Sequence, residues 1–118
     1  MTKHRVNWLT VPDNYALNAA CMRMAEAFDN HPYLVGSVLQ RADYHDVDVR
    51  MMLADKQFKR MFPTTPILLL SNAMYSHKLA HDTGLPIDFQ FQDTTEANAE
   101  FDGYRHSLGM PSYREATQ

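Results

Sequence analysis

The order of apolar and polar residues divides the chain into three segments of helical character. Apolar side chains recur at roughly helical spacing over residues 14–28, and Asp13 stands where a helix N-cap is expected. Residues 54–62 carry a short amphipathic pattern. Residues 66–83 carry a long one, followed by Gly84, a residue type common just past a helix end. The pattern predicts one long helix early in the chain and a pair of helices in its middle.

Three further segments have the period or the composition of β-strands. Residues 33–36 are apolar and partly β-branched, and they end at Gly36. Residues 45–53 and 85–92 alternate polar with apolar side chains at the two-residue period of a strand. The predicted order is helix, strand, strand, helix pair, strand and tail, which is an α/β (α+β) arrangement with a small sheet.

Length, composition and charge indicate one folded domain. The chain has 118 residues, of which 45% are hydrophobic and 21% charged, as in ordinary globular proteins. We expect a core over about residues 13–92 and a C-terminal tail over 93–118, in which turn signals are mixed with the pattern of a short helix. The formal net charge of −3 argues against a general nucleic-acid binder, so we expect no general binding to DNA.

The single cysteine and the absence of long apolar runs bear on the cellular compartment. Cys21 lies among alanines and methionines, which favours a buried, inert thiol, and one cysteine cannot form an internal disulfide. No apolar run approaches the roughly 18 residues of a membrane span, and the N-terminus lacks the apolar stretch of a signal peptide. We therefore expect a soluble, cytoplasmic protein with no membrane partner.

Two carboxylates interrupt the second predicted strand. Asp46 and Asp48 are two residues apart, so they point to the same face and repel each other unless a proton, a basic neighbour or a divalent cation intervenes. Clustered oxygen ligands suit Mg²⁺ or Mn²⁺. Asp88 completes the cluster if the third strand lies beside the second, and Phe89 and Phe91 then face the core. Three such carboxylates could hold two ions, one activating an attacking hydroxyl and the other steadying a leaving pyrophosphate.

Four further residues are candidates for contacting a nucleotide. Gly36 lacks a Cβ, so a phosphate can approach its backbone, and Ser37 adds a hydroxyl and a backbone N–H. Arg41 could reach a triphosphate from the connection that follows. Arg50 shares a face with Asp48 and either contacts a nucleotide phosphate or neutralises the aspartates. The second role would replace the metal, and the sequence leaves both roles open.

These motifs, taken together, resemble the nucleotidyltransferase superfamily of the polymerase-β type. The resemblance is carried by LVGS (34–37), DVDV (46–49) and IDF (87–89), and the match spans about residues 13–92. It is closest to a small single-domain group of the superfamily met in phage and bacterial genomes. The spacer after Gly-Ser has only eight residues, and His45 stands where a serine often precedes the first aspartate.

The resemblance implies a nucleotidyltransferase-like fold, with a small mixed sheet flanked by helices, and Mg²⁺-dependent transfer of a nucleoside monophosphate from an NTP. By position, Asp46 and Asp48 match the metal-binding pair, and Asp88 matches the third acid. Gly36 and Ser37 match the turn that contacts the phosphates. The implied setting is a bacterial or phage-infected cell.

Three functions stay open from the sequence, in descending order of preference. The first is an enzyme that transfers a nucleoside monophosphate to a protein, an RNA or a small hydroxyl compound, which requires Asp46, Asp48 and Asp88 to converge. The second is a non-catalytic nucleotide-binding module that keeps the fold without the chemistry. The third is a structural or interaction module, oligomers included, in which Arg41 or Arg50 neutralises the acids.

Overall fold

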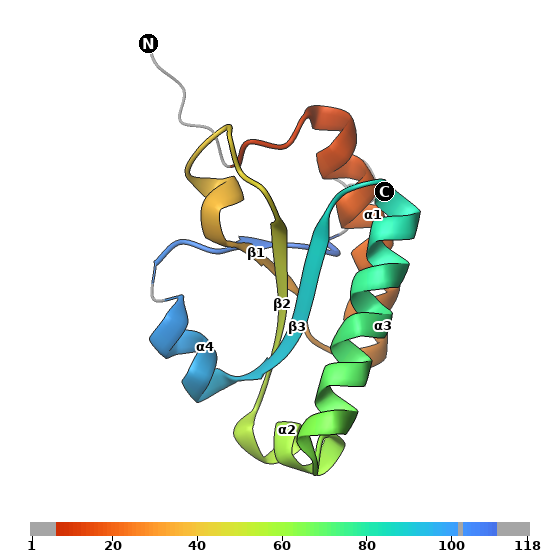
Figure 1. Cartoon of the computed structure of the whole chain (residues 1–118), viewed down its shortest axis with the longest axis vertical. Coiled ribbons are helices and arrows are strands. Elements are labelled where there is room, and N and C mark those ends of the chain that lie inside the picture. Colours follow the sequence, from red (N-terminus) through yellow and green to blue (C-terminus); the bar gives the residue numbers. More distant parts are fainter. Residues whose placement is uncertain (1–6, 102, 111–118) are drawn as a thin grey trace.

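The computed structural model describes residues 7–101 and 103–110, and Figure 1 shows their arrangement. Its elements in chain order are α1 (Val11–Phe28), β1 (Tyr33–Val35), the 3-10 helix η1 (Gly36–Leu39), β2 (Val47–Leu53), α2 (Asp55–Met61), α3 (Thr65–Thr83), β3 (Ile87–Asp93), α4 (Thr94–Glu100) and β4 (His106–Ser107). The three predicted helices and three predicted strands are all present. Two further elements, α4 and β4, fold from the segment that the sequence pattern left as a tail.

The described strands form one mixed sheet in the order β3-β2-β1-β4. Strand β1 runs antiparallel to β2 and β4, whereas β2 and β3 are parallel because α2 and α3 carry the chain back between them. Helices α1 and α3 lie on one side of the sheet, and η1 and α4 lie on the other (Figure 1). The α+β class, with a small mixed sheet flanked by helices, is confirmed.

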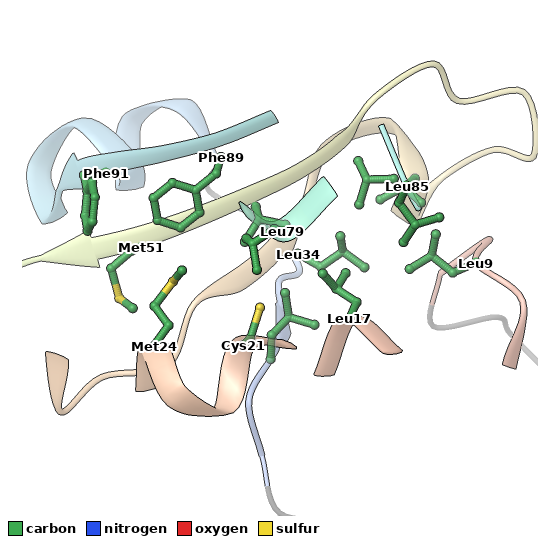
Figure 2. Close-up of a cluster of buried hydrophobic side chains, with 14 of the residues drawn as sticks. Leu9, Leu17, Cys21, Met24, Leu34, Met51, Leu79, Leu85, Phe89 and Phe91 are labelled. Atoms are coloured by element: carbon green, nitrogen blue, oxygen red, sulfur yellow. The ribbon is translucent and has the colours of Figure 1, made fainter. Parts of the chain in front are cut away.

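The main core fills the space between the sheet and the helices α1 and α3 (Figure 2). Phe89 and Phe91 of β3 face this core as predicted, with only 1% and 2% of their surface exposed. A buried phenylalanine contributes about 1.5–3 kcal/mol relative to an exposed one. Cys21 of α1 is also buried, as predicted, and burial raises the pKa of its thiol to about 12, which disfavours the reactive thiolate.

The opposite face of the sheet is covered only in part. A small apolar cluster of Val35, Met52 and Ala97, with Tyr33 and Phe101 beside it, joins α4 to β1 and β2. This cluster covers β2 toward its C-terminal end, at Met52. The N-terminal end of β2 and the start of β3 keep an open polar face, and this is where the aspartates lie.

The predicted capping residue is wrong for the start of α1 and confirmed for the end of α3. Helix α1 begins earlier than predicted, and its N-cap is Thr10, whose hydroxyl accepts the backbone N–H of Asp13 at 3.2 Å. The prediction of Asp13 as N-cap is therefore wrong, because a threonine three residues before it takes that role. Helix α3 ends as predicted at Gly84, which adopts a left-handed conformation with φ of 73°.

Helix α3 also occupies the outer edge of β3, the first strand of the sheet. The hydroxyl of Ser76 accepts the backbone N–H of Phe89 at 2.8 Å and donates to the C=O of the same residue at 3.2 Å. The side-chain oxygen of Asn72 accepts the N–H of Phe91 at 2.9 Å. Backbone groups that an edge strand would expose are thus bonded to a helix of the same chain.

No helix within the described ranges combines the length and the apolar character needed to cross a membrane.

Candidate functional site

The candidate site is built around the junction of β1 and η1. Strand β1 ends at Val35, and the chain turns at Gly36, whose φ of 82° lies in the left-handed region that favours glycine. A Cβ at this position would collide with a carboxylate oxygen of Asp48, which is paired with Val35 across the sheet. The backbone of Gly36 and the carboxylate of Asp48 are therefore in direct contact.

Asp48 and Asp88 are brought together by the sheet register. They are direct partners on the parallel strands β2 and β3, so their side chains emerge side by side on the open face. The predicted placement of the third strand beside the second is confirmed. The Asp48 side chain is 21% exposed and that of Asp88 is 43% exposed, which leaves both accessible from solvent.

The electrostatics of Asp48 show that its negative charge is not fully compensated. Burial raises the pKa of this carboxyl to about 6, and the carboxylates of Asp88 and Asp46 add to the rise. Arg50 opposes the rise, but its effect is smaller than that of burial. The Arg50 guanidinium therefore offsets only part of the effect of burial on this carboxyl.

Asp46 lies just before β2 rather than within it, and its side chain is exposed. It is close enough to influence the charge of Asp48. Within residues 7–101 and 103–110, however, no group of three or more His, Cys, Asp or Glu side chains is arranged to hold a metal ion. The carboxylates that the structure places side by side are the pair Asp48 and Asp88.

Arg50 is held mainly by backbone atoms and not by the carboxylates. It is 4% exposed, and its Nη1 donates to the C=O of Asp88 at 2.7 Å and of Val49 at 3.1 Å. Its Nη2 lies 3.5 Å from a carboxylate oxygen of Asp88 and 3.7 Å from one of Asp48. The ring of Phe101 lies 5.6 Å from the guanidinium carbon, a cation–π distance. Of the two roles left open, partial neutralisation of the aspartates is observed.

Part of Arg50 is nevertheless unused. Its Nε is buried and has no hydrogen-bond partner among the described residues, and its Nη2 contacts are long for charge-assisted hydrogen bonds. A buried N–H without a partner costs about 1–3 kcal/mol. The guanidinium is therefore incompletely satisfied within the described residues, and only its Nη2 is placed near the carboxylates of Asp48 and Asp88.

Ser37 and Arg41 are placed differently from each other. Ser37 is the second residue of η1, next to Gly36, and its C=O accepts the N–H groups of Gln40 and Arg41 at 2.9 and 3.0 Å. The guanidinium of Arg41 lies 3.6 Å from Asp43 and its side chain is 62% exposed. Arg41 thus points to its own loop, and it is not among the groups that set the charge of Asp48.

Two residues of the site escaped the sequence analysis. Gln90 donates from Nε2 to Asp88 at 3.4 Å, and the alternation along β3, which puts it on the face of Asp88, was sufficient to find it. Phe101 was missed because it follows a helix of only seven residues within the expected tail. No periodic pattern there reveals that its ring covers Arg50.

The donors at the site fit a hard divalent cation. Mg²⁺ is typically bound through one or two carboxylates, with waters and substrate phosphates completing its coordination. Asp48 and Asp88 supply two adjacent carboxylates with solvent access, and a cation there would stabilise the ionised form of Asp48, which burial and then the neighbouring carboxylates disfavour.

Comparisons of this chain with protein-family models, with curated proteins and with solved structures found no match.

Proposed function

We propose that this protein is a metal-dependent nucleotidyltransferase, which moves a nucleoside monophosphate from an NTP to a hydroxyl group of an acceptor. The observation that carries the proposal is the in-register pair Asp48 and Asp88, which lies against the backbone of Gly36 on the open face of the sheet. The two carboxylates would hold a cation. The adjacent turn at Gly36, which has no side chain, would let phosphates approach that cation. The nucleotide substrate places this activity in the cytoplasm.

Asp48 and Asp88 would hold Mg²⁺ or Mn²⁺, with Asp46 adding negative charge at the rim. When bound, the cation would stabilise the charge that develops on the transferring phosphoryl group and on the leaving pyrophosphate. The backbone of Gly36 and the hydroxyl of Ser37 would contact the β- and γ-phosphates. The Nη2 of Arg50, which lies 3.7 Å from Asp48 and 3.5 Å from Asp88, would add positive charge near the pyrophosphate.

Asp88 is the more exposed carboxylate of the pair, which suits it to orient the acceptor and take its proton. In the transfer step the acceptor oxygen forms a bond to the α-phosphorus as the bond from that phosphorus to the bridging oxygen breaks. The acceptor proton passes to Asp88, and pyrophosphate leaves with the bridging oxygen. A protein, an RNA or a small hydroxyl compound would each satisfy this chemistry.

One observation favours a second candidate, a structural or nucleotide-binding module without turnover. Arg50 lies within 3.7 Å of Asp48 and 3.5 Å of Asp88, as expected if an internal cation served the aspartates. The raised pKa of Asp48 argues against this role as the complete one. The two candidates differ in a measurable way, because a module of the structural kind would gain no stability from Mg²⁺ and nucleotide.

The test is calorimetric binding of each Mg²⁺–NTP to the native protein, to Asp48→Asn and to a matched control, Asp29→Asn. Asp29 is an exposed C-cap with φ of 50°, a conformation that asparagine also adopts, so the control removes one carboxylate without touching the site. The adjacent Asn30 bonds to Met52, which lies toward the other end of β2 from Asp48.

We expect binding that requires the metal and is lost in Asp48→Asn but kept in Asp29→Asn. Labelled NTP then identifies acceptors by the transfer of label and the release of pyrophosphate. If no NTP binds to the native protein, the proposal is wrong and the structural module takes its place. If Asp48→Asn binds NTP as the native protein does, the proposal is wrong and the nucleotide-binding module without turnover takes its place.

A further inference from the structure

A pocket of about 270 Å³ is lined in part by Gly36, the residue that contacts the carboxylate of Asp48, and the function proposed above does not yet use it. Its lining includes Gly36 and Gln40 from the η1 side, and Glu100, Phe101 and Tyr104 from the segment that leads from α4 toward β4. In Figure 1 both segments lie on the side of the sheet opposite α1 and α3. The pocket therefore opens on the same face as the aspartates.

Two residues of the lining also contact the aspartate site. Gly36 touches the carboxylate of Asp48, and the ring of Phe101 lies over the guanidinium of Arg50. A molecule whose phosphates contact Gly36 thus has this pocket directly beside its phosphate end. The volume is slightly below the range of about 300–1,000 Å³ found for drug-sized ligands, and it suits a base with part of its sugar.

Glu100 gives the pocket a defined polarity. The buried amide of Gln92, 1% exposed, donates from Nε2 to one carboxylate oxygen of Glu100 at 3.0 Å. This bond reaches Glu100 from β3, the strand that also carries Asp88. An ionised carboxylate only accepts hydrogen bonds, and it does so through two oxygens. A ligand that meets Glu100 must therefore present donors, and two parallel donors satisfy it best.

We propose that this pocket binds the guanine base of the nucleotide, an inference that rests on the function proposed above. Guanine presents its ring N1–H and its 2-amino group side by side, which matches the two oxygens of a carboxylate. Adenine and cytosine present one amino group next to a ring-nitrogen acceptor, and uracil presents one N–H between two carbonyls. Only guanine meets Glu100 without placing an acceptor against it. Tyr104, 63% exposed at the pocket, offers a ring on which the base stacks.

The test compares Mg²⁺ complexes of GTP, ITP, ATP, CTP and UTP by calorimetry, together with GMP in metal-free buffer. Inosine lacks only the 2-amino group of guanosine, so ITP isolates one of the two donors. The variants are Glu100→Gln and, as a matched control, Glu96→Gln, which removes an exposed carboxylate from the other end of the same helix. Tyr104→Ala tests stacking separately. Circular dichroism establishes that each variant is folded.

We expect GTP to bind at least about tenfold more tightly than ATP or ITP, the size of one hydrogen bond to a charged group. Glu100→Gln should reduce this preference to within about threefold, whereas Glu96→Gln should keep it. Tyr104→Ala should weaken all five nucleotides, since stacking does not discriminate strongly among bases.

The outcomes separate this inference from the proposed function. Equal, Asp48-dependent binding of all five nucleotides overturns the guanine pocket and leaves the transferase standing. Glu100-dependent binding of GMP, together with GTP binding that requires neither Mg²⁺ nor Asp48, supports the pocket and removes the transferase. The absence of binding by every nucleotide overturns both.

Discussion

The two faces of the sheet are formed by the same strands but differ in character: one packs in the apolar core, and the other carries the candidate site. Toward α1 and α3, Val49 and Phe89 are almost completely buried in an apolar core. Toward η1 and α4, their chain neighbours Asp48 and Asp88 stand half-covered beside a pocket. Successive residues of a strand point to opposite faces, so a register slip by one residue would carry the aspartates into the core. The core face therefore fixes the position of the polar face.

The faces also differ in how well their polar groups are satisfied. The polar face holds two buried atoms without hydrogen-bond partners among the described residues, Nε of Arg50 and Oε1 of Gln92. Each such atom costs about 1–3 kcal/mol. The core face supplies the apolar burial that offsets this cost. A polar face that lowers stability is expected where side chains are kept for binding and not for packing.

The largest expected effect comes from truncating the core face. Phe89→Ala should lower the free energy of unfolding by about 3–5 kcal/mol, because it removes a ring that packs against Tyr75 and Phe91. Gln90→Ala, one residue along on the other face, should change it by less than about 1 kcal/mol. Urea denaturation measures both. Similar losses for the two variants would mean that the faces do not divide packing and binding as described.

The second-largest effect is the pH dependence of stability that Asp48 causes. Ionised aspartates usually stabilise the folded state, whereas ionisation of Asp48 destabilises it because its pKa is raised. Its pKa of about 6 in the folded protein exceeds the ordinary value of 3.8 for an aspartate, so well below pH 4 the group is protonated in both folded and unfolded states. As pH rises from about 4 to 6, the unfolded state releases the proton first and the folded state is destabilised, by at most about 3 kcal/mol once pH exceeds 6, since solvent screens a partly exposed group.

Asp48→Asn should therefore be more stable than the native protein at pH 7, and the two should converge toward pH 4. Urea denaturation at pH 4, 5, 6 and 7 gives this difference directly. Mg²⁺ at pH 7 should stabilise the native protein and not the variant. A variant that is less stable than the native protein at pH 7 would contradict the assignment of an uncompensated charge.

The smallest expected effect distinguishes two costs of replacing a glycine: the strain of a left-handed backbone conformation and the clash of a new Cβ with a neighbouring side chain. Gly36 and Gly84 both have positive φ, 82° and 73°, but a Cβ at Gly84 would meet nothing within 4 Å. Gly84→Ala should thus cost only the conformational term, about 1 kcal/mol. Gly36→Ala should cost about 1–2 kcal/mol more, because it displaces the carboxylate of Asp48. Equal losses, measured by thermal unfolding, would show that Gly36 and Asp48 are not in contact.

The sequence predicted the positions of Asp48 and Asp88 better than it predicted the residues that surround them. The alternation in residues 45–53 and 85–92 put Asp48 and Asp88 opposite the core residues, and the sheet confirms that arrangement. The same period could not show where β2 begins, and Asp46 falls just outside it. Strand boundaries depend on pairing with a partner strand, which a single sequence does not contain.

Sequence patterns could not predict the role of Arg50 or the position of β4. An arginine that shares a face with Asp48 has the same spacing whether it bonds to a carboxylate or to the backbone C=O of Asp88. Strand β4 has two residues and pairs only with β1, so its position follows from long-range contact and not from local preference. Periodicity in the sequence does not predict structural features that depend on tertiary contacts.

The covering of β3 by α3 limits how copies of this chain can associate. Open sheet edges recruit strands from other molecules, but here Ser76 and Asn72 already bond to the backbone N–H groups of Phe89 and Phe91. A second chain could extend the sheet at this edge only by displacing a 19-residue helix that also packs on the core. The strand that carries Asp88 is thus shielded from association, and among residues 7–101 and 103–110 the opposite edge of the sheet is formed by the two-residue strand β4.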